Sequence, residues 1–177
     1  MQRFLGITLI ASLSACGRYS FKDVPDAQLD APPDAGMCGA KDDLHPMGQL
    51  SSYRIGSPID SWDHAEASCE ADGYGAHLVV FDNSLEMNAA EDIAAAGFGN
   101  TKFWIGISDR VTDMSFIPVT GGVTPFFPSW VDNAPSIVGP SCVLFDPDTR
   151  RIQDLPCAMV ANYICECDGT PPKANAY

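Results

Sequence analysis

The residues with the clearest potential for chemistry are seven cysteines. They stand at Cys16, Cys38, Cys69, Cys142, Cys157, Cys165 and Cys167. A reducing compartment would leave most of them unpaired, so their number predicts export and disulfide formation. Cys16 follows a short apolar segment, and without it an even number of cysteines remains. Spacing alone does not decide which of the many pairings forms.

Aspartates in the second half of the chain offer oxygen ligands for a hard cation such as calcium. They are Asp109, Asp113, Asp132, Asp146 and Asp148. The alternative interpretation is that they are turn residues and solvated charges, which a chain with 23 acidic residues is expected to contain. We therefore expect no resident cofactor, with calcium at a rearranged site as the alternative.

The three histidines do not indicate catalysis. His45, His64 and His77 show no metal-ligand spacing such as His-x-x-x-His. His64 is expected on the exposed side of a helix and His77 at the start of a strand, and both are interpreted as surface or structural residues. Because every cysteine is expected to be lipidated or disulfide-bonded, no thiol nucleophile is left. The sequence predicts that the protein is not an enzyme.

Net charge and the N-terminal residues indicate whether the protein binds nucleic acid or a membrane. The formal charge of −13 would repel phosphate backbones, so no nucleic-acid partner is expected. Arg3 and the apolar residues 4–15 form a secretory signal that is too short to span a bilayer. Contact with a membrane must therefore come from another source.

The end of the apolar segment, Leu13-Ser14-Ala15-Cys16, resembles a bacterial lipobox. This resemblance implies that Cys16 is lipidated and that its acyl chains anchor the protein. An ordinary secretory signal cleaved near Cys16 is the alternative. Gly17, in place of an aspartate, resembles the pattern of lipoproteins that are moved to the outer membrane. We expect a lipid-anchored protein of the bacterial cell envelope, with the exposed membrane face left open.

Four segments are expected along the 177 residues. Residues 1–15 are the lipoprotein signal peptide, and residues 16–37 are the lipidated cysteine with a tether rich in Pro, Asp and Ala. Residues 38–168 form one globular domain, and residues 169–177 form a C-terminal tail. The tether has little to bury, so it is expected to be extended and solvated.

Inside the domain the order of elements is α+β, with two helices followed mainly by strands. The helices are expected at 62–72, capped by Ser61, and at 85–96, where Asn83 and Glu86 make a capping box. Runs of β-branched and aromatic residues predict strands at 78–81, 103–107, 142–145 and 162–165.

The segment 109–140 fits neither the helical nor the strand period. It contains five prolines and three glycines between mixed polar and apolar residues. A long irregular segment in a compact domain is usually a functional surface loop. We therefore expect the binding residues on this segment.

An ordered set of residues along the domain resembles the C-type lectin-like fold. It comprises Trp62, Ala65, Cys69, His77-Leu78-Val79, Glu86, Trp104-Ile105-Gly106-Ile107, Trp130, Pro135, Cys142, Cys157 and Tyr163-Ile164-Cys165-Glu166. The resemblance covers nearly all of residues 38–168. It implies two helices, short antiparallel sheets and a long surface loop, held together by disulfides. It also implies that Trp62 and Trp104 pack in the core and that Trp130 packs at the base of the loop.

The resemblance also implies a disulfide pattern. It pairs Cys69 with Cys165, and it pairs Cys142 with Cys157 across the base of the loop. Cys38 and Cys167 are left for each other, because the two ends of this fold lie side by side. An exchange between Cys165 and Cys167 is the alternative.

Sugar-binding members of this family hold calcium with a set of loop oxygens that this sequence mostly lacks. Ala134-Pro135-Ser136 stands where the family has Glu-Pro-Asn or Gln-Pro-Asp, and Pro140 replaces a further acid. Ile152-Gln153-Asp154 stands in place of Trp-Asn-Asp, so Asp154 keeps a carboxylate and Gln153 an amide oxygen. Calcium requires more oxygen ligands than these two residues supply, so we expect no family-type site.

We expect a recognition module of lectin-like type, anchored to the envelope, that binds a protein or a surface glycan without the usual calcium site. One alternative is a calcium-dependent lectin with rearranged ligands, and another is a structural lipoprotein with no discrete ligand. The sequence names neither the ligand nor the oligomeric state. The expected binding face comprises Phe126, Phe127, Asp132, Asn133, Ser136, Ile137, Asp146, Asp148 and Asp154.

Overall fold

The computed structural model of the chain describes residues 44–46, 50–123 and 126–177, all within the unit that spans Asp34–Tyr177. The expected signal peptide, Cys16, the tether and Cys38 lie outside the described residues. The expectations for them stay predictions.

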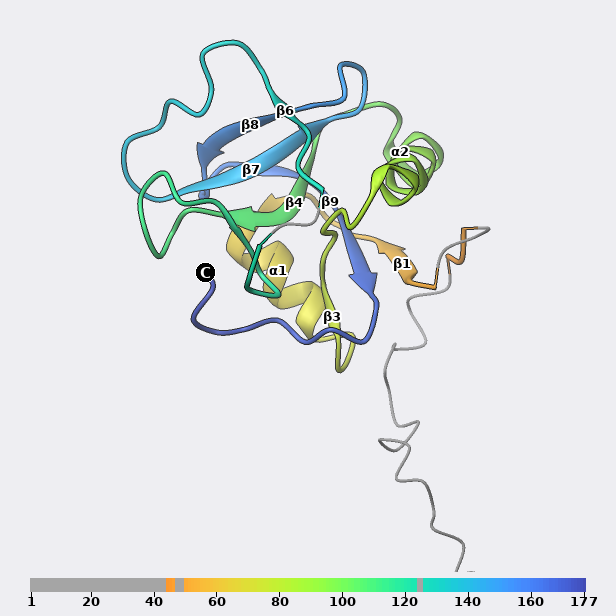
Figure 1. Cartoon of the computed structure of the whole chain (residues 1–177). Helices are drawn as coiled ribbons and strands as arrows, with labels where there is room; N and C mark the ends of the chain where they lie inside the picture. Colours follow the sequence, from red (N-terminus) through yellow and green to blue (C-terminus); the bar gives the residue numbers. More distant parts are fainter. Residues whose placement is uncertain (1–43, 47–49, 124–125) are drawn as a thin grey trace, which may run out of the picture. The chain divides into compact units, whose positions relative to one another are not determined.

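The strands of the described residues form one network built around the long strand β9 (Figure 1). Their bounds are β1 (Ser52–Ile55), β2 (Asp60–Ser61), β3 (Ala76–Leu78), β4 (Phe103–Ser108), β5 (Ile117–Pro118), β6 (Ser129–Trp130), β7 (Ser141–Asp146), β8 (Arg151–Pro156) and β9 (Val160–Cys167). The hydrogen-bonded order is β1-β9-β4-β7-β8-β6, with β2 and β3 on β9 and β5 on β4. Most pairs are antiparallel, as expected, but β4 with β9 and β6 with β8 run parallel.

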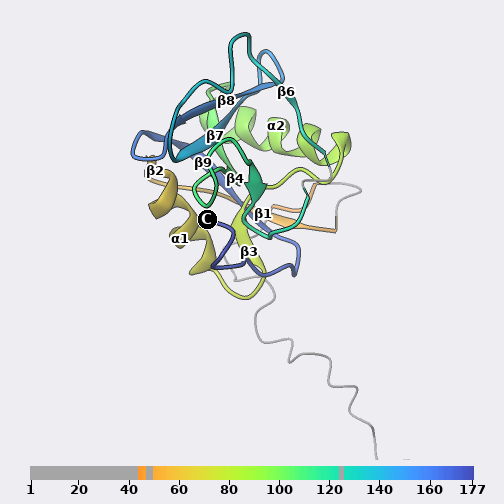
Figure 2. The same ribbon diagram turned by 60° about the vertical axis from the view of Figure 1, so that its left-hand side comes forward.

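Helix α1 (Trp62–Glu70) ends two residues before the expected boundary. Ser61 occupies its N-cap position, but the serine side chain makes no capping hydrogen bond, so that expectation is wrong. Helix α1 packs against β2, β3, β4 and β9 (Figures 1 and 2).

Within the described part of the chain, no helix is long and apolar enough to cross a membrane.

Helix α2 (Ser84–Phe98) is longer than expected and packs against β1 and β9. The Asn83 side chain caps it as predicted, because its oxygen accepts hydrogen bonds from two backbone N–H groups of the first turn. Glu86 does not complete the capping box. Its carboxylate is buried and instead accepts hydrogen bonds from the Asp82 N–H and the Tyr53 hydroxyl.

The core consists of two apolar clusters, one between α2 and the sheet and one between α1 and the sheet. Trp62 and Trp104 are fully buried, as predicted. Each indole N–H is satisfied by a carbonyl, with Trp62 donating to Ile105 at 2.8 Å and Trp104 donating to Asp60 at 3.1 Å. These bonds remove the cost of burying a polar indole group.

Gly106 in the Trp-Ile-Gly sequence allows β4 to cross closely over the chain after β3. A Cβ at this position would lie 2.5 Å from the Leu78 carbonyl oxygen. The Gly106 N–H donates instead to the Val79 carbonyl at 2.8 Å. The strand expected at 78–81 is thus a short strand ending at Leu78, followed by a buried extended segment.

Both disulfides that the resemblance implies are present. Cys69 on α1 is bonded to Cys165 on β9, and Cys142 on β7 is bonded to Cys157, just before β9. Cys167 is disulfide-bonded as well. Because Cys38 lies outside the described residues, its pairing with Cys167 stays a prediction.

Candidate functional site

The segment 109–140 leaves the end of β4 and returns at the start of β7, as Figure 1 shows. In its described residues, 109–123 and 126–140, the segment contains only the two-residue strands β5 and β6, so most of the backbone N–H groups there have no strand partner. An irregular backbone needs other acceptors to hold one conformation. Buried aspartates supply several of them.

Asp109 joins the two ends of the segment. Its carboxylate accepts hydrogen bonds from the Ser141 N–H at 2.6 Å, the Ser141 hydroxyl at 2.9 Å and the Met114 N–H at 2.9 Å. Only 1% of the residue is exposed. This aspartate therefore positions the loop backbone, and it is not the solvated charge that the sequence alternative describes.

Two further aspartates fix the returning half of the segment. The buried Asp154 on β8 accepts from the Ser136 N–H at 2.7 Å and the Ile137 N–H at 2.5 Å through one carboxylate oxygen. Asp113 accepts from the Gly139 N–H at 3.0 Å, so the outgoing and returning halves touch. The loop is held from β8 and across its own two halves.

The position where the family holds calcium does not fit that ion in this chain. Asp154 is its single carboxylate, and one of that carboxylate's oxygens is already engaged by the loop backbone. Ala134 and Pro140 contribute no side-chain oxygen, and calcium requires several charged oxygen ligands at short range. In the described residues, no group of three or more His, Cys, Asp or Glu side chains is placed to hold a metal ion.

The segment displays apolar side chains to solvent. Of the eleven large hydrophobic side chains that are exposed in the described residues, five belong to 109–140. They are Val111 (55% exposed), Met114 (52%), Val123 (89%), Phe127 (38%) and Val138 (91%). Since the Asp113–Gly139 hydrogen bond joins their neighbours, Met114 and Val138 lie on the same part of the loop. A concentration of exposed apolar groups marks an interaction surface.

Aromatic rings support this surface from below. The Trp130 ring lies 4.7 Å from the Phe116 ring and 5.4 Å from the Phe127 ring, between ring centres. Phe126 packs against the core cluster under α2. Of the two phenylalanines predicted on the binding face, only Phe127 is exposed, and Trp130 lies at the base of the loop, as predicted.

The other residues of the predicted face are not gathered in one place. Asp146 is the last residue of β7 and Asp148 belongs to the turn before β8, about 17 Å along the strand from Ser141. Asp146 accepts from the N–H groups of that turn and pairs with Lys102 at 3.3 Å. Partial burial opposes it, but the hydrogen bond and charge of Lys102 hold the pKa of Asp146 below its ordinary value. The aspartates do not form one acidic rim around the loop.

Asp132, Asn133, Ser136 and Ile137 do belong to the segment. Asp132 is exposed and forms an ion pair with Arg151 at 2.9 Å. Asn133 is an exposed turn residue with a left-handed φ of 66°, a conformation that asparagine tolerates. Ser136 is exposed and Ile137 is half-buried. Sequence reasoning missed Val111, Met114, Val123 and Val138, because single apolar residues between turn residues carry no periodic signal.

The histidines take the places that the sequence predicts for surface and structural residues. His45 and His64 are exposed, and His64 lies 3.1 Å from Asp60. His77 is fully buried, with Nδ1 at 2.8 Å from the Leu78 carbonyl and Nε2 at 3.3 Å from Asp168. None of the three lies in the segment 109–140.

Comparison with known proteins agrees with this geometry. The sequence model of the family described as Lectin C-type domain matches residues 59–167. The chain is 26% identical over 114 residues to subunit B2 of the snaclec coagulation factor IX/factor X-binding protein of Trimeresurus stejnegeri, covering 64% of this chain and 73% of that protein. It is 36% identical over 105 residues to C-type lectin domain family 3 member A of Mus musculus, covering 57% and 53%.

A solved structure has the same fold. Human lithostathine superposes with a TM-score of 0.61 at 22% sequence identity, covering 73% of this chain and 98% of lithostathine. At this level of identity the similarity shows the fold alone.

Proposed function

The chain belongs to the C-type lectin domain family, whose members are carbohydrate- or protein-binding modules, and we propose that it binds a protein ligand through the segment 109–140 without calcium. The observation that carries this proposal is the exposure of Val111, Met114, Val123, Phe127 and Val138 on a backbone held by the buried Asp109 and Asp154. A loop that is already ordered loses little conformational entropy on binding. Its apolar groups suit the core of a protein interface, whereas a sugar needs a closely spaced set of polar groups.

Calcium independence is supported by the side chains around Asp154. One oxygen of this carboxylate accepts hydrogen bonds from the Ser136 and Ile137 N–H groups of the loop. These internal hydrogen bonds hold the loop where a coordinated cation would otherwise hold it. A protein ligand is supported by the name of the snaclec relative, which describes binding to coagulation factors IX and X.

The site of action proposed for this module is the bacterial cell envelope, where lipid on Cys16 would hold it. The support is the lipobox-like Leu13-Ser14-Ala15-Cys16 and the Pro/Asp/Ala-rich residues that follow it. Replacing Cys16→Ser should move the protein from the membrane fraction to the soluble fraction. Sedimentation of the variant with envelopes after a salt wash would contradict lipid anchoring.

A pair of matched substitutions tests the binding face. Val138→Ser removes an apolar side chain from the loop, and Val160→Ser makes the same change at an exposed position on β9, outside the loop. Each purified variant is immobilised, and the envelope proteins that it retains are quantified with calcium and with a chelator. We expect Val138→Ser alone to reduce retention of a defined protein, equally in both buffers.

Three results would overturn the proposal. Equal retention by the two variants would remove the loop from the binding face. Loss of retention in chelator, together with a rise in melting temperature on addition of calcium, would favour the calcium-dependent alternative, because a ligand that binds only the native state stabilises it. If the immobilised domain retained glycans but no protein, a glycan would replace a protein as the proposed class of ligand.

A further inference from the structure

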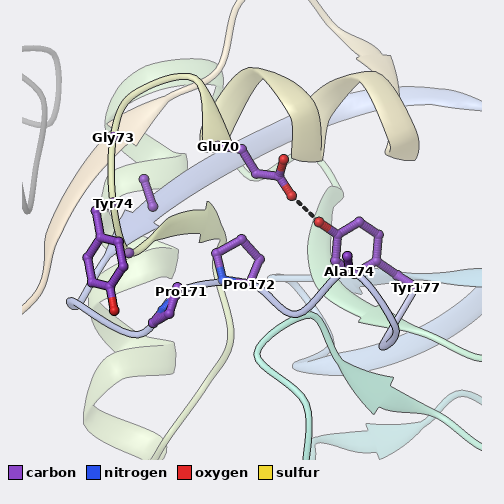
Figure 3. A pocket seen from close by; sticks show the side chains of 9 residues that line it. Glu70, Gly73, Tyr74, Pro171, Pro172, Ala174 and Tyr177 are labelled. Atoms are coloured by element: carbon purple, nitrogen blue, oxygen red, sulfur yellow. Dashed lines mark hydrogen bonds between the residues drawn. The ribbon is translucent and has the colours of Figure 1, made fainter.

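A pocket of about 290 Å³ lies between the end of α1, the turn before β3 and the residues that follow β9 (Figure 3). Its walls include Glu70, Tyr74, Pro171, Pro172 and Tyr177. None of the residues that line it belongs to the segment 109–140. The pocket is therefore separate from the binding face proposed above.

One wall of the pocket is built by residues beyond the stretch 59–167 that matches the family. Residues 169–177 were expected to be a tail, but they pack against the domain. The Lys173 N–H donates to the Val119 carbonyl at 2.8 Å, and Ala176 is only 3% exposed. The Tyr177 ring meets the buried Trp62 ring edge-on, with 5.7 Å between ring centres.

The start of this wall is tied to β3. His77 has a carbonyl oxygen next to one ring nitrogen and the Asp168 carboxylate next to the other, and two acceptors favour the doubly protonated ring. Burial opposes the charge, but the hydrogen bonds to Asp168 and Leu78 raise the pKa of His77 overall. The Asp168 carboxylate also accepts from the Thr170 N–H at 2.6 Å.

A glycine pair brings the two walls together. Gly75 has a left-handed φ of 78°, and a Cβ at this position would lie 2.5 Å from the Gly169 backbone. A larger residue would therefore push the two walls apart. The close approach of Gly75 to Gly169 and the hydrogen bonds of His77 and Asp168 therefore hold the two walls of the pocket in place.

The chemistry of the pocket is aromatic, apolar and negatively charged. Tyr74 is 60% exposed, and Figure 3 shows its ring on one side of the pocket, with Tyr177 on the other and the two prolines between them. The Tyr177 hydroxyl donates to the Glu70 carboxylate, which leaves the second carboxylate oxygen of Glu70 available to a ligand. No basic side chain is found among the residues that line the pocket.

The charges that act on Tyr177 at the pocket are mostly negative. Burial raises the pKa of Tyr177 above its ordinary value, and the hydrogen bond to Glu70 and the charges of Glu66 and Glu70 raise it further. Arg110, the cation that acts on Tyr177 in the opposite direction, is already paired with Asp63 and lies over the Trp62 ring at 5.8 Å. The whole chain carries a net charge of −13, which favours a cationic partner.

We propose that this pocket binds the side chain of an arginine or lysine presented by a protein partner. The aliphatic stem would lie along Pro171 and Pro172, and the cationic head would meet the Glu70 carboxylate and the tyrosine rings. Charge-assisted hydrogen bonds and cation–π contacts are the interactions that this combination of groups supplies.

The test uses short peptides with the purified full chain. Acetyl-Gly-Arg-Gly-amide is titrated while the ring signals of Tyr74 and Tyr177 are followed by NMR, and acetyl-Gly-Gln-Gly-amide is the neutral control. We expect saturable shifts of both tyrosines with the arginine peptide and binding weaker by roughly fivefold or more with the glutamine peptide. Methyl α-glucoside, added at the same concentrations, tests a sugar as the ligand.

Two variants assign the binding to the pocket. Glu70→Gln removes the charge but keeps an oxygen that can accept from the Tyr177 hydroxyl, and it should weaken the arginine peptide by roughly fivefold or more. Asp92→Asn removes the same charge from the exposed side of α2, and it should leave binding unchanged. The proposal is overturned by equal binding of the two peptides, by stronger shifts with the glucoside, or by equal effects of the two variants.

Discussion

Buried acids differ between the loop 109–140 and the region around β9. The carboxylates of Asp109, at the start of the loop, and Asp154, on β8, each accept hydrogen bonds from at least two backbone N–H groups of the loop segment. Around β9, Glu66 accepts one backbone N–H, from Leu78 at 2.8 Å, and Glu166 accepts one from Val80 at 3.0 Å. Burial raises the pKa of Glu66 to about 7, and burial and the neighbouring Glu86 raise that of Glu166.

The difference shows two uses of a buried carboxylate. An acid with several N–H donors holds a backbone that has no strand partners, as Asp109 does for the loop. An acid with a single backbone N–H donor joins elements that already have regular structure, and burial raises its pKa, as at Glu66. The loop should therefore depend on its acids for shape, and the β9 region should depend on pH for stability.

The largest effect is expected from removing the disulfide of each region. Cys69–Cys165 in the β9 region closes a loop of 96 residues, and Cys142–Cys157 below the segment 109–140 closes one of 15. Replacing both cysteines of a pair with serine should lower the free energy of unfolding by about 4–5 kcal/mol for the first and about 3 kcal/mol for the second. Urea denaturation measures both values, and the reverse order would contradict the comparison.

Removing the acid that closes the loop should come next. Asp109→Ala leaves the Ser141 N–H, the Ser141 hydroxyl and the Met114 N–H without their acceptor in a buried position. We expect a loss of about 3 kcal/mol in the free energy of unfolding and faster amide hydrogen exchange in the loop. Asp148→Ala, in the exposed turn between β7 and β8, is the control and should change neither quantity. Unchanged exchange in the Asp109 variant would mean that the loop holds its shape by other contacts.

The β9 region should lose stability as pH rises. The pKa of Glu66 is about 7 in the folded protein and 4.5 as a free side chain, so the folded state holds its proton more tightly. The contribution of this proton is fully present below the unfolded pKa and is lost as pH rises through the folded pKa, by about 3 kcal/mol in total. The raised pKa of His77 changes the stability in the same direction. The lowered pKa of Asp168 affects the stability only in more acidic solution, where its carboxylate becomes protonated.

Glu66→Gln tests this pH dependence, because the amide oxygen can still accept from the Leu78 N–H. The free energy of unfolding, measured at about pH 5 and about pH 8, should differ less in the variant than in the parent protein. Asp92→Asn is the exposed control and should keep the parent's dependence. An equal pH dependence in all three proteins would show that Glu66 does not carry it.

The fold could be predicted from the sequence where the signal is an ordered set of large or unusual residues. Trp62 and Trp104 in the core and the bridge Cys69–Cys165 are of this kind, since each requires one residue type at one place. Strand β8 (Arg151–Pro156) was not predicted, because its buried Ile152 and Asp154 alternate with polar residues and one of them is an acid.

The candidate site was predicted as a segment but not as a set of residues. The composition of 109–140 indicates a functional loop, yet the N–H donors that reach Asp109 and Asp154 depend on where an irregular backbone passes. The exposure of Val138 and the burial of Phe126 depend on the same path. Neither periodicity nor composition contains this information, so the sequence placed both phenylalanines on the face and omitted the valines.

The smallest effect on stability is expected at Phe127, and its neighbour provides the contrast. Phe126 packs against the core cluster, so Phe126→Ser should lower the free energy of unfolding by about 2 kcal/mol through lost apolar burial. Phe127 is 38% exposed and contacts mainly the Trp130 ring, so Phe127→Ser should cost well under about 1 kcal/mol. Because it faces solvent beside the other exposed apolar groups, the same change should still weaken retention of the protein ligand. Urea denaturation and the retention assay, applied to both variants, separate the two roles. If Phe127→Ser destabilised the domain as much as Phe126→Ser, its ring would belong to the core, and the binding face would be reduced to the exposed valines and Met114.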